Sequence, residues 1–247
     1  MLKNLLKRKM PPAAQPAASP APQLPVPVEG LDYGAQKNLL AGADMNARLQ
    51  LAQASDTRPE ILYFLAGDEP SEVRQAVAAN PATPVQADEV LVDDADEEVR
   101  GDLALKIARL LPDMPEDEQE KIRELTFDML RRLASDQLPR VRAMLSEELK
   151  SSRHVPHAVV RQLALDAAVI VSAPVLEYSP LLNDADLMEV IAAGCAQEAL
   201  CAIANRSKVS EDVSDAVVAT FDVPAVATLL ANKKASVREA TLDKIAE

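Results

Sequence analysis

One ten-residue motif recurs along the chain and limits what the chain can fold into. It has the form Leu-x-x-Asp-x-x-x-x-Val-Arg and first occurs at Leu65–Arg74. It returns at Leu91–Arg100 and Leu133–Arg142, at Leu229–Arg238 with Asn for Asp, and in degraded form at Leu163–Ser172, where Ser replaces Arg. The last residues of successive copies are 26, 42, 30 and 66 positions apart. Motifs with periods of roughly 20 to 50 residues indicate stacked supersecondary units, so the chain is predicted to be a repeat protein.

The chemistry of the motif predicts where each residue lies. Leu closes one helix onto the core, Asp accepts hydrogen bonds from free backbone N–H groups in the turn, and Val and Arg lie in the first turns of the next helix. Val faces inward, while Arg, roughly 100° around the helix, can reach an Asp in its own or the adjacent repeat. We call this predicted row the ladder. Its members are Asp68, Arg74, Asp94, Arg100, Asp136, Arg142, Asn232 and Arg238.

An anion-binding row of arginines is the alternative interpretation of the same residues. The Asp at a fixed offset from Arg74, Arg100 and Arg142 favours the structural ladder, because it supplies these cations with a carboxylate.

The Asp-x-x-x-x-Val-Arg unit resembles the HEAT repeat, whose helix pairs stack into a superhelix with an Asp and Arg ladder. Residues 73–100 also resemble leucine-rich-repeat-variant units, through Asn80, Pro81, Thr83 and Pro84 between successive Val-Arg pairs. Residues 173–191 and 202–218 resemble the signature of a bacterial domain-of-unknown-function family of HEAT-like superhelices.

These resemblances cover about residue 62 to the C-terminus. They imply an all-α fold, a right-handed α-α superhelix (HEAT-like solenoid). The composition of the residues before it, rich in Pro and Ala with almost no charge, predicts a disordered Pro/Ala-rich tail. They imply no catalytic residues. The iron-sulfur cluster of some variant-repeat proteins needs a cysteine cluster, and this chain has only Cys195 and Cys201.

Composition agrees with stacked helices. Aromatic residues make up 2% of the chain, Trp is absent and there are six Gly, so the core must consist of Ala, Leu and Val. Two cysteines without a disulfide framework fit a reducing cytoplasm, and Cys195 and Cys201 are interpreted as core side chains rather than as a redox pair.

We divide the chain into four parts. Residues 1–10 are predicted to form a short basic amphipathic helix, 11–30 a Pro/Ala-rich disordered linker, 31–172 the N-terminal HEAT-like and variant repeats, and 173–247 further repeats of the same solenoid. Residues 31–54 are expected to be a helical cap broken near Gly42, and 115–133 a long helix. The stack is expected to bend or change subclass near residue 172, where the motif loses its Arg.

The first ten residues, MLKNLLKRKM, combine an apolar stripe with four cations. The sequence predicts weak, salt-sensitive docking on an anionic membrane surface, peripheral to the inner membrane, or in the groove of a partner protein. A disordered solubilising tail is the alternative, because ten residues are too few for a stable isolated helix. The predicted docking residues are Leu2, Lys3, Leu5, Leu6, Lys7, Arg8 and Lys9.

The first 30 residues and the rest of the chain carry net charges of opposite sign. Residues 1–30 hold four basic and one acidic side chain, which leaves 22 basic against 38 acidic in the rest, a difference of −16. An acidic body repels phosphate backbones, so no nucleic acid partner is expected.

The sequence contains no recognisable catalytic, cofactor or metal motif. His154 and His157 are the only histidines, Pro156 lies between them, and no third ligand is near in sequence, so no metal site is predicted. We therefore expect a non-catalytic protein interaction scaffold with an unidentified protein partner. The alternative is a small-ligand-binding or enzymatic domain with a pocket in the C-terminal half around Arg153, His154, His157 and Tyr178.

Overall fold

The structure is a computed structural model that describes residues 28–42, 44–113 and 120–246. The predicted helix at 1–10 and residues 11–27 of the predicted linker lie outside the described residues, as do residues 115–119 of the predicted long helix. Within the described residues, the chain forms fifteen α-helices and one 3₁₀ helix, and the only β-type pairing is an isolated bridge between Val209 and Ala235.

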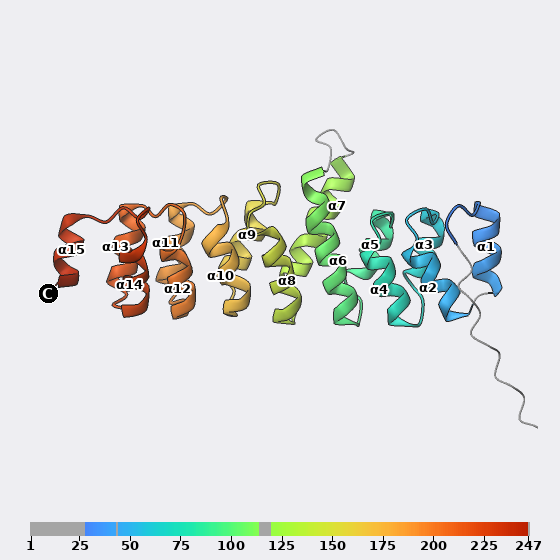
Figure 1. The fold of residues 1–247 in the computed structure, drawn as a ribbon, viewed down its shortest axis with the longest axis horizontal. Coiled ribbons are helices and arrows are strands. Elements are labelled where there is room, and N and C mark those ends of the chain that lie inside the picture. The colour runs from blue at the N-terminus through green and yellow to red at the C-terminus, as the bar shows by residue number, and fades with distance from the viewer. Residues whose placement is uncertain (1–27, 43, 114–119, 247) are drawn as a thin grey trace, which may run out of the picture.

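The helices form two layers (Figure 1). In the even-numbered layer each helix packs directly on the next, from α2 to α14. The even-numbered helices are α2 (Met45–Gln53), α4 (Ser71–Ala79), α6 (Glu97–Leu110), α8 (Pro139–Leu149), α10 (Val169–Tyr178), α12 (Gln197–Ala204) and α14 (Val223–Ala231).

The odd-numbered helices cover one side of this layer and contact one another less closely. They are α1 (Tyr33–Gly42), α3 (Pro59–Leu65), α5 (Val85–Leu91), α7 (Glu120–Ala134), α9 (His157–Ala164), α11 (Asp184–Ala192), α13 (Glu211–Ala219) and α15 (Glu239–Ala246); the 3₁₀ helix η1 (Leu111–Asp113) follows α6. Consecutive helix pairs therefore stack in chain order into a superhelix, and the predicted all-α fold class is confirmed.

The motif residues explain how each pair forms. The motif Leu side chains at the ends of α3, α5, α7 and α9 are buried, and so are the motif Val side chains in the first turns of α4, α6, α8 and α10. Between them, Asp94, Asp136 and Asp166 each accept a hydrogen bond of 2.9 Å from the backbone N–H two residues later. The turn is thus closed by one short acceptor, and the two helices share a core of Leu, Val and Ala.

The copy at Leu229–Arg238 lies in a different place from the other copies. Its Leu and Asn fall at the end of the even-numbered helix α14, and its Val and Arg precede α15, so this turn runs from the even-numbered to the odd-numbered layer. The residues before α15 are held in an irregular segment by the hydrogen bond from Ser236 N to Val209 O (3.0 Å). We expected Asn232 and Arg238 to continue the arrangement of the first three copies. This expectation is wrong, because their turn connects the layers in the opposite order.

Other predicted boundaries can be compared directly with the structure. The expected cap at residues 31–54 corresponds to α1 and α2, and Asp44 caps α2 by accepting a hydrogen bond from Ala47 N at 3.0 Å. The described part of the expected long helix is α7. The even-numbered layer is continuous through α8, α10 and α12, and the bend near residue 172 stays a prediction.

Candidate protein-binding site

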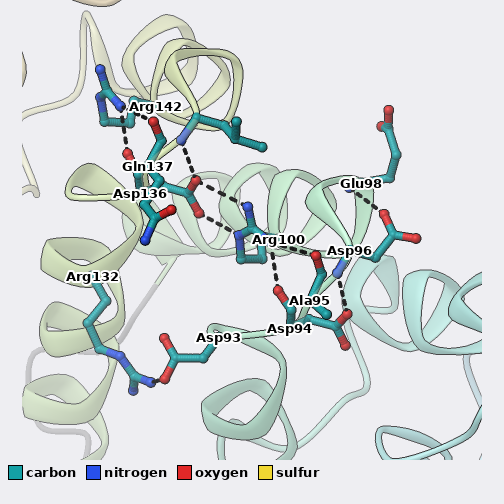
Figure 2. A network of polar contacts seen from close by, with 11 residues as sticks. Asp93, Asp94, Ala95, Asp96, Glu98, Arg100, Arg132, Asp136, Gln137 and Arg142 are labelled. Atoms are coloured by element: carbon teal, nitrogen blue, oxygen red, sulfur yellow. Dashed lines mark hydrogen bonds and ion pairs between the residues drawn. The ribbon is translucent and has the colours of Figure 1, made fainter.

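Three arginines, Arg74, Arg100 and Arg142, connect consecutive repeats through one repeated set of contacts. Figure 2 shows this set for Arg100. Each arginine forms a two-point ion pair with the motif Asp of the following repeat. The Nε–Oδ2 and Nη2–Oδ1 distances are 2.6 and 2.9 Å for Arg74–Asp94, 2.5 and 3.2 Å for Arg100–Asp136, and 2.5 and 3.0 Å for Arg142–Asp166.

The same guanidinium groups also bind their own repeats. Nη1 of Arg74, Arg100 and Arg142 donates to the backbone carbonyl of the motif Asp six residues earlier, at 2.8, 2.6 and 2.6 Å. Each Arg therefore fixes the turn before its own helix and the turn of the next repeat. This geometry leaves little of the guanidinium free for an external anion.

The electrostatics agree with that assignment. The hydrogen bond to Asp94 raises the pKa of Arg74 above its ordinary value, and Asp136 and Asp166 do the same for Arg100 and Arg142. Burial opposes the ionisation of Asp166, but the hydrogen bonds from Arg142 and from the backbone of Ala168 outweigh it and lower the pKa of this carboxyl group.

The ladder extends one step further toward the N-terminus than the motif indicates. Arg48 in α2 has its Nε 3.2 Å from Oδ2 of Asp68, although neither atom has a hydrogen-bond partner of good geometry among the described residues. Sequence reasoning missed Arg48 because no motif precedes it.

The ladder ends at Asp166, because Ser172 takes the place of the next Arg. Asn232 and Arg238 lie elsewhere. Arg238 is an exposed side chain that pairs with three carboxylates of α13, those of Glu211, Asp212 and Asp215.

Beyond α10 the repeats are connected at the opposite edge, where even-numbered helices end. Arg206 donates to the carbonyls of Leu176 and Ser179, the latter at 2.8 Å, and burial lowers the pKa of its guanidinium. Asn232 donates to the carbonyls of Ala204 and Arg206, both at 2.8 Å. These side chains satisfy carbonyl groups that a helix end leaves free.

Asn80 makes the same kind of contact in the N-terminal half. Its side-chain amide donates to the carbonyls of Ala52 and Ala54 at 2.8 and 3.0 Å. Helix-end amide contacts therefore occur in both halves, whereas the Arg–Asp ladder is confined to the first.

A buried ion pair joins α5 to α6. Nζ of Lys106 lies 2.5 Å from Oδ1 of Asp88, and both residues are at most 6% exposed. Burial raises the pKa of Asp88 to about 6 and lowers that of Lys106. The sequence did not single out either residue, because their burial depends on how α5 sits on α6.

A groove of about 450 Å³ crosses three consecutive even-numbered helices, α2, α4 and α6. Its floor includes the small side chains of Ala76 and Ala79, and its carboxylates are Glu72 and Asp102. Asp102 accepts a hydrogen bond of 2.8 Å from Gln75. The groove therefore offers shallow apolar surface beside negative charge. The complete lining is Leu49, Gln53, Glu72, Gln75, Ala76, Ala79, Asn80, Pro81 and Asp102.

The four residues of the alternative pocket are not brought together. Arg153 and His154 line a second pocket of about 430 Å³ between the ends of α6 and α8. His157 instead points its Nε2 at Oδ2 of Asp186 in α11, at 2.9 Å, and the Tyr178 ring lies 5.1 Å from Nζ of Lys150.

Among residues 28–42, 44–113 and 120–246, no group of three or more His, Cys, Asp or Glu side chains could hold a metal ion. Cys195 and Cys201 are free, half-buried thiols, and burial raises the pKa of Cys195. Cys195 lies in the turn before α12 rather than in a helix. No helix in this described part of the chain has both the length and the apolar character needed to cross a membrane.

The fold places the chain among all-α proteins built from stacked helix pairs. Residues 171–247 match a family described as "Uncharacterised protein conserved in bacteria (DUF2336)". No curated protein and no solved structure matches the chain. The family match begins inside α10, the helix that follows Asp166, the last residue of the Arg–Asp ladder.

Proposed function

We propose that this chain is a non-catalytic scaffold that binds a protein partner through the exposed face of its even-numbered helices. The observation that carries the proposal is the groove across α2, α4 and α6, where Glu72 and Asp102 lie beside Ala76 and Ala79. Residues 31–247 of this chain carry a net charge of −16. A partner segment with basic and small apolar side chains therefore fits this surface best.

We further propose that the repeats are HEAT-like throughout, with leucine-rich-repeat-variant-like units in the N-terminal half. The repeated Asp turns, the buried motif Val side chains and the ladder of Arg74, Arg100 and Arg142 support this assignment. A cytoplasmic location is proposed from the two unpaired cysteines.

Affinity purification from the native host, followed by mass spectrometry, tests the scaffold proposal when charge variants are compared. Glu72→Lys reverses a charge inside the groove. Glu124→Lys makes the same change on the exposed side of α7, outside the groove. A partner captured by the unchanged protein and by Glu124→Lys, but lost with Glu72→Lys, supports the groove. Equal capture by all three proteins contradicts it.

For residues 1–10 we propose weak contact with an anionic membrane surface or with a partner. The support is the sequence alone, four cations beside an apolar stripe. Co-sedimentation with anionic vesicles at low and moderate salt, with and without residues 1–10, tests the membrane version. Binding that needs these residues and weakens with salt supports it; no binding at low salt excludes it.

The alternative of a ligand-binding or enzymatic pocket has weaker support. It would rest on Arg153 and His154, since His157 and Tyr178 contact other groups.

A further inference from the structure

Three large apolar side chains project from the odd-numbered layer near its N-terminal end. Tyr63 and Phe64 of α3 are 52% and 65% exposed, and Val90 of α5 is 50% exposed. Phe64 and Val90 hold the same position in consecutive repeats, 26 residues apart, and α3 packs against α5. We call these three exposed residues, on two helices that pack together, the α3–α5 patch.

The equivalent position in the next two repeats is used differently. There the residues are Arg132, which pairs with Asp93 of the preceding repeat, and Gln162, which donates to Ser135 at 2.8 Å (Figure 2 shows the first of these pairs). In α7 and α9 this row thus serves contacts between repeats, whereas in α3 and α5 it presents apolar side chains to the surroundings.

The charge around the α3–α5 patch is negative. Glu60 in α3 and Glu89 in α5 are exposed, and neither forms an ion pair with another residue in the part of the chain that the structure describes. Neither helix contains Lys or Arg, and the nearest cation in sequence is Arg58, which precedes α3. A ligand with an apolar stripe and several cations complements such a surface.

The chain itself carries such a segment, and it enters the described structure beside α3. Gly30 N donates to Oδ2 of Asp56 at 2.5 Å. The Gln36 side chain bonds the carbonyl of Asp56 and the N–H of Arg58, at 3.2 and 3.0 Å. Gly30 and Gln36 are thereby fixed against Asp56 and Arg58 in the loop before α3.

The 17 residues from 11 to 27 separate that point from the basic segment. A Pro-rich linker of this length reaches about 50 Å at about 3.1 Å per residue. The patch is much closer, because α3 has seven residues, about 10 Å in length, and neighbouring helices lie about 10 Å apart.

We propose that residues 1–10 dock on the α3–α5 patch of the same chain. Leu2, Leu5 and Leu6 cover the apolar side chains, and the lysines and Arg8 face Glu60 and Glu89. Joining the two in one chain gives an effective concentration of about 1 mM, so even a dissociation constant of about 0.1 mM leaves about nine-tenths of the molecules docked. Contact of this segment with a membrane or a partner then requires its release from the patch.

The test introduces a single indole, Leu6→Trp, into the full chain, which has no Trp of its own. The proposal predicts a blue-shifted emission maximum and reduced quenching by acrylamide. Both effects should disappear when Phe64→Ser and Val90→Ser are added. They should persist with Phe221→Ser and Val223→Ser, a matched change at two apolar residues that are 87% and 76% exposed at the start of α14.

Three outcomes overturn the proposal. One is an indole that is equally exposed in all these proteins, and another is an indole that is shielded regardless of Phe64 and Val90. The third is shielding that is lost on dilution, because docking within one chain does not depend on protein concentration. The scaffold proposal survives any of these, since Glu72→Lys alters a different layer of the fold.

Discussion

Each of the three ladder arginines Arg74, Arg100 and Arg142 binds two repeats, its own and the following one. Arg100 binds the carboxylate of Asp136 in the following repeat and, through Nη1, the carbonyl of Asp94 in the turn before its own helix. The pair is partly buried and hydrogen-bonded at both ends, so removing one member leaves the other desolvated and unpaired.

Asp136→Ala should therefore cost about 2–4 kcal/mol of unfolding free energy, because it leaves Arg100 without its partner. The matched control is Glu97→Ala, whose exposed carboxylate lies 3.4 Å from Arg140; it should cost well under about 1 kcal/mol. Thermal or denaturant unfolding measures both. Equal and negligible losses would reopen the arginine row as a binding surface.

Acid should weaken the last step of the ladder in a defined way. The folded-state pKa of Asp166 is lowered, so its stabilisation is fully present above the unfolded value of about 3.9 and is lost as the pH falls through the folded value. The difference in unfolding free energy between the unchanged protein and Asp166→Asn should therefore shrink as the pH is lowered below about 4. Urea titrations from pH 7 to pH 3 check this, and a difference independent of pH would speak against an ionised pair.

Between elements, the interaction that the sequence least indicates is the buried pair that ties α5 to α6. Asp88 and Lys106 are enclosed together, and burial works against the charge on both. Breaking such a pair is expected to cost more than replacing both members with apolar residues of similar size.

Asp88→Ala alone should destabilise the fold by about 3–5 kcal/mol, because it strands a buried ammonium group. The double variant Asp88→Leu/Lys106→Met should be close to neutral, within about 1–2 kcal/mol of the unchanged protein. Chemical denaturation of the two variants compares them. A double variant as unstable as the single one would contradict this expectation. It would show that the ion pair itself holds α5 on α6, and that the loss in Asp88→Ala is not due only to an unpaired buried charge.

The repeat motif predicted the stacked helix pairs because it encodes a local event, the Asp turn followed by a buried Val. It did not predict Arg48 as the first member of the ladder or the pair of Lys106 with Asp88, because both depend on which helices face each other after stacking. The copy at residues 229–238 shows that a match to the motif does not fix which layers its turn connects. Its residues fit the motif, but its turn leads from the even-numbered to the odd-numbered layer.

Along the full stack, the contacts between repeats change in type near α10. The Arg–Asp ladder connects the turns from α3 to α10 and is absent from the described repeats after α10, where Arg206 and the Asn232 amide connect helix ends, as the Asn80 amide also does in the N-terminal half. In a stacked-repeat protein each unit contacts only its neighbours, so stability is the sum of nearest-neighbour terms and a local change spreads only a short distance.

Hydrogen exchange followed by mass spectrometry tests this central claim most directly, on the full chain with Arg100→Ala. Arg100 joins the α5–α6 unit to the α7–α8 unit. Faster exchange is predicted in both units, with little change in α11 to α14. Change confined to the turn around residue 100, or spread evenly to α14, would contradict a superhelix whose neighbouring repeats are coupled through the ladder.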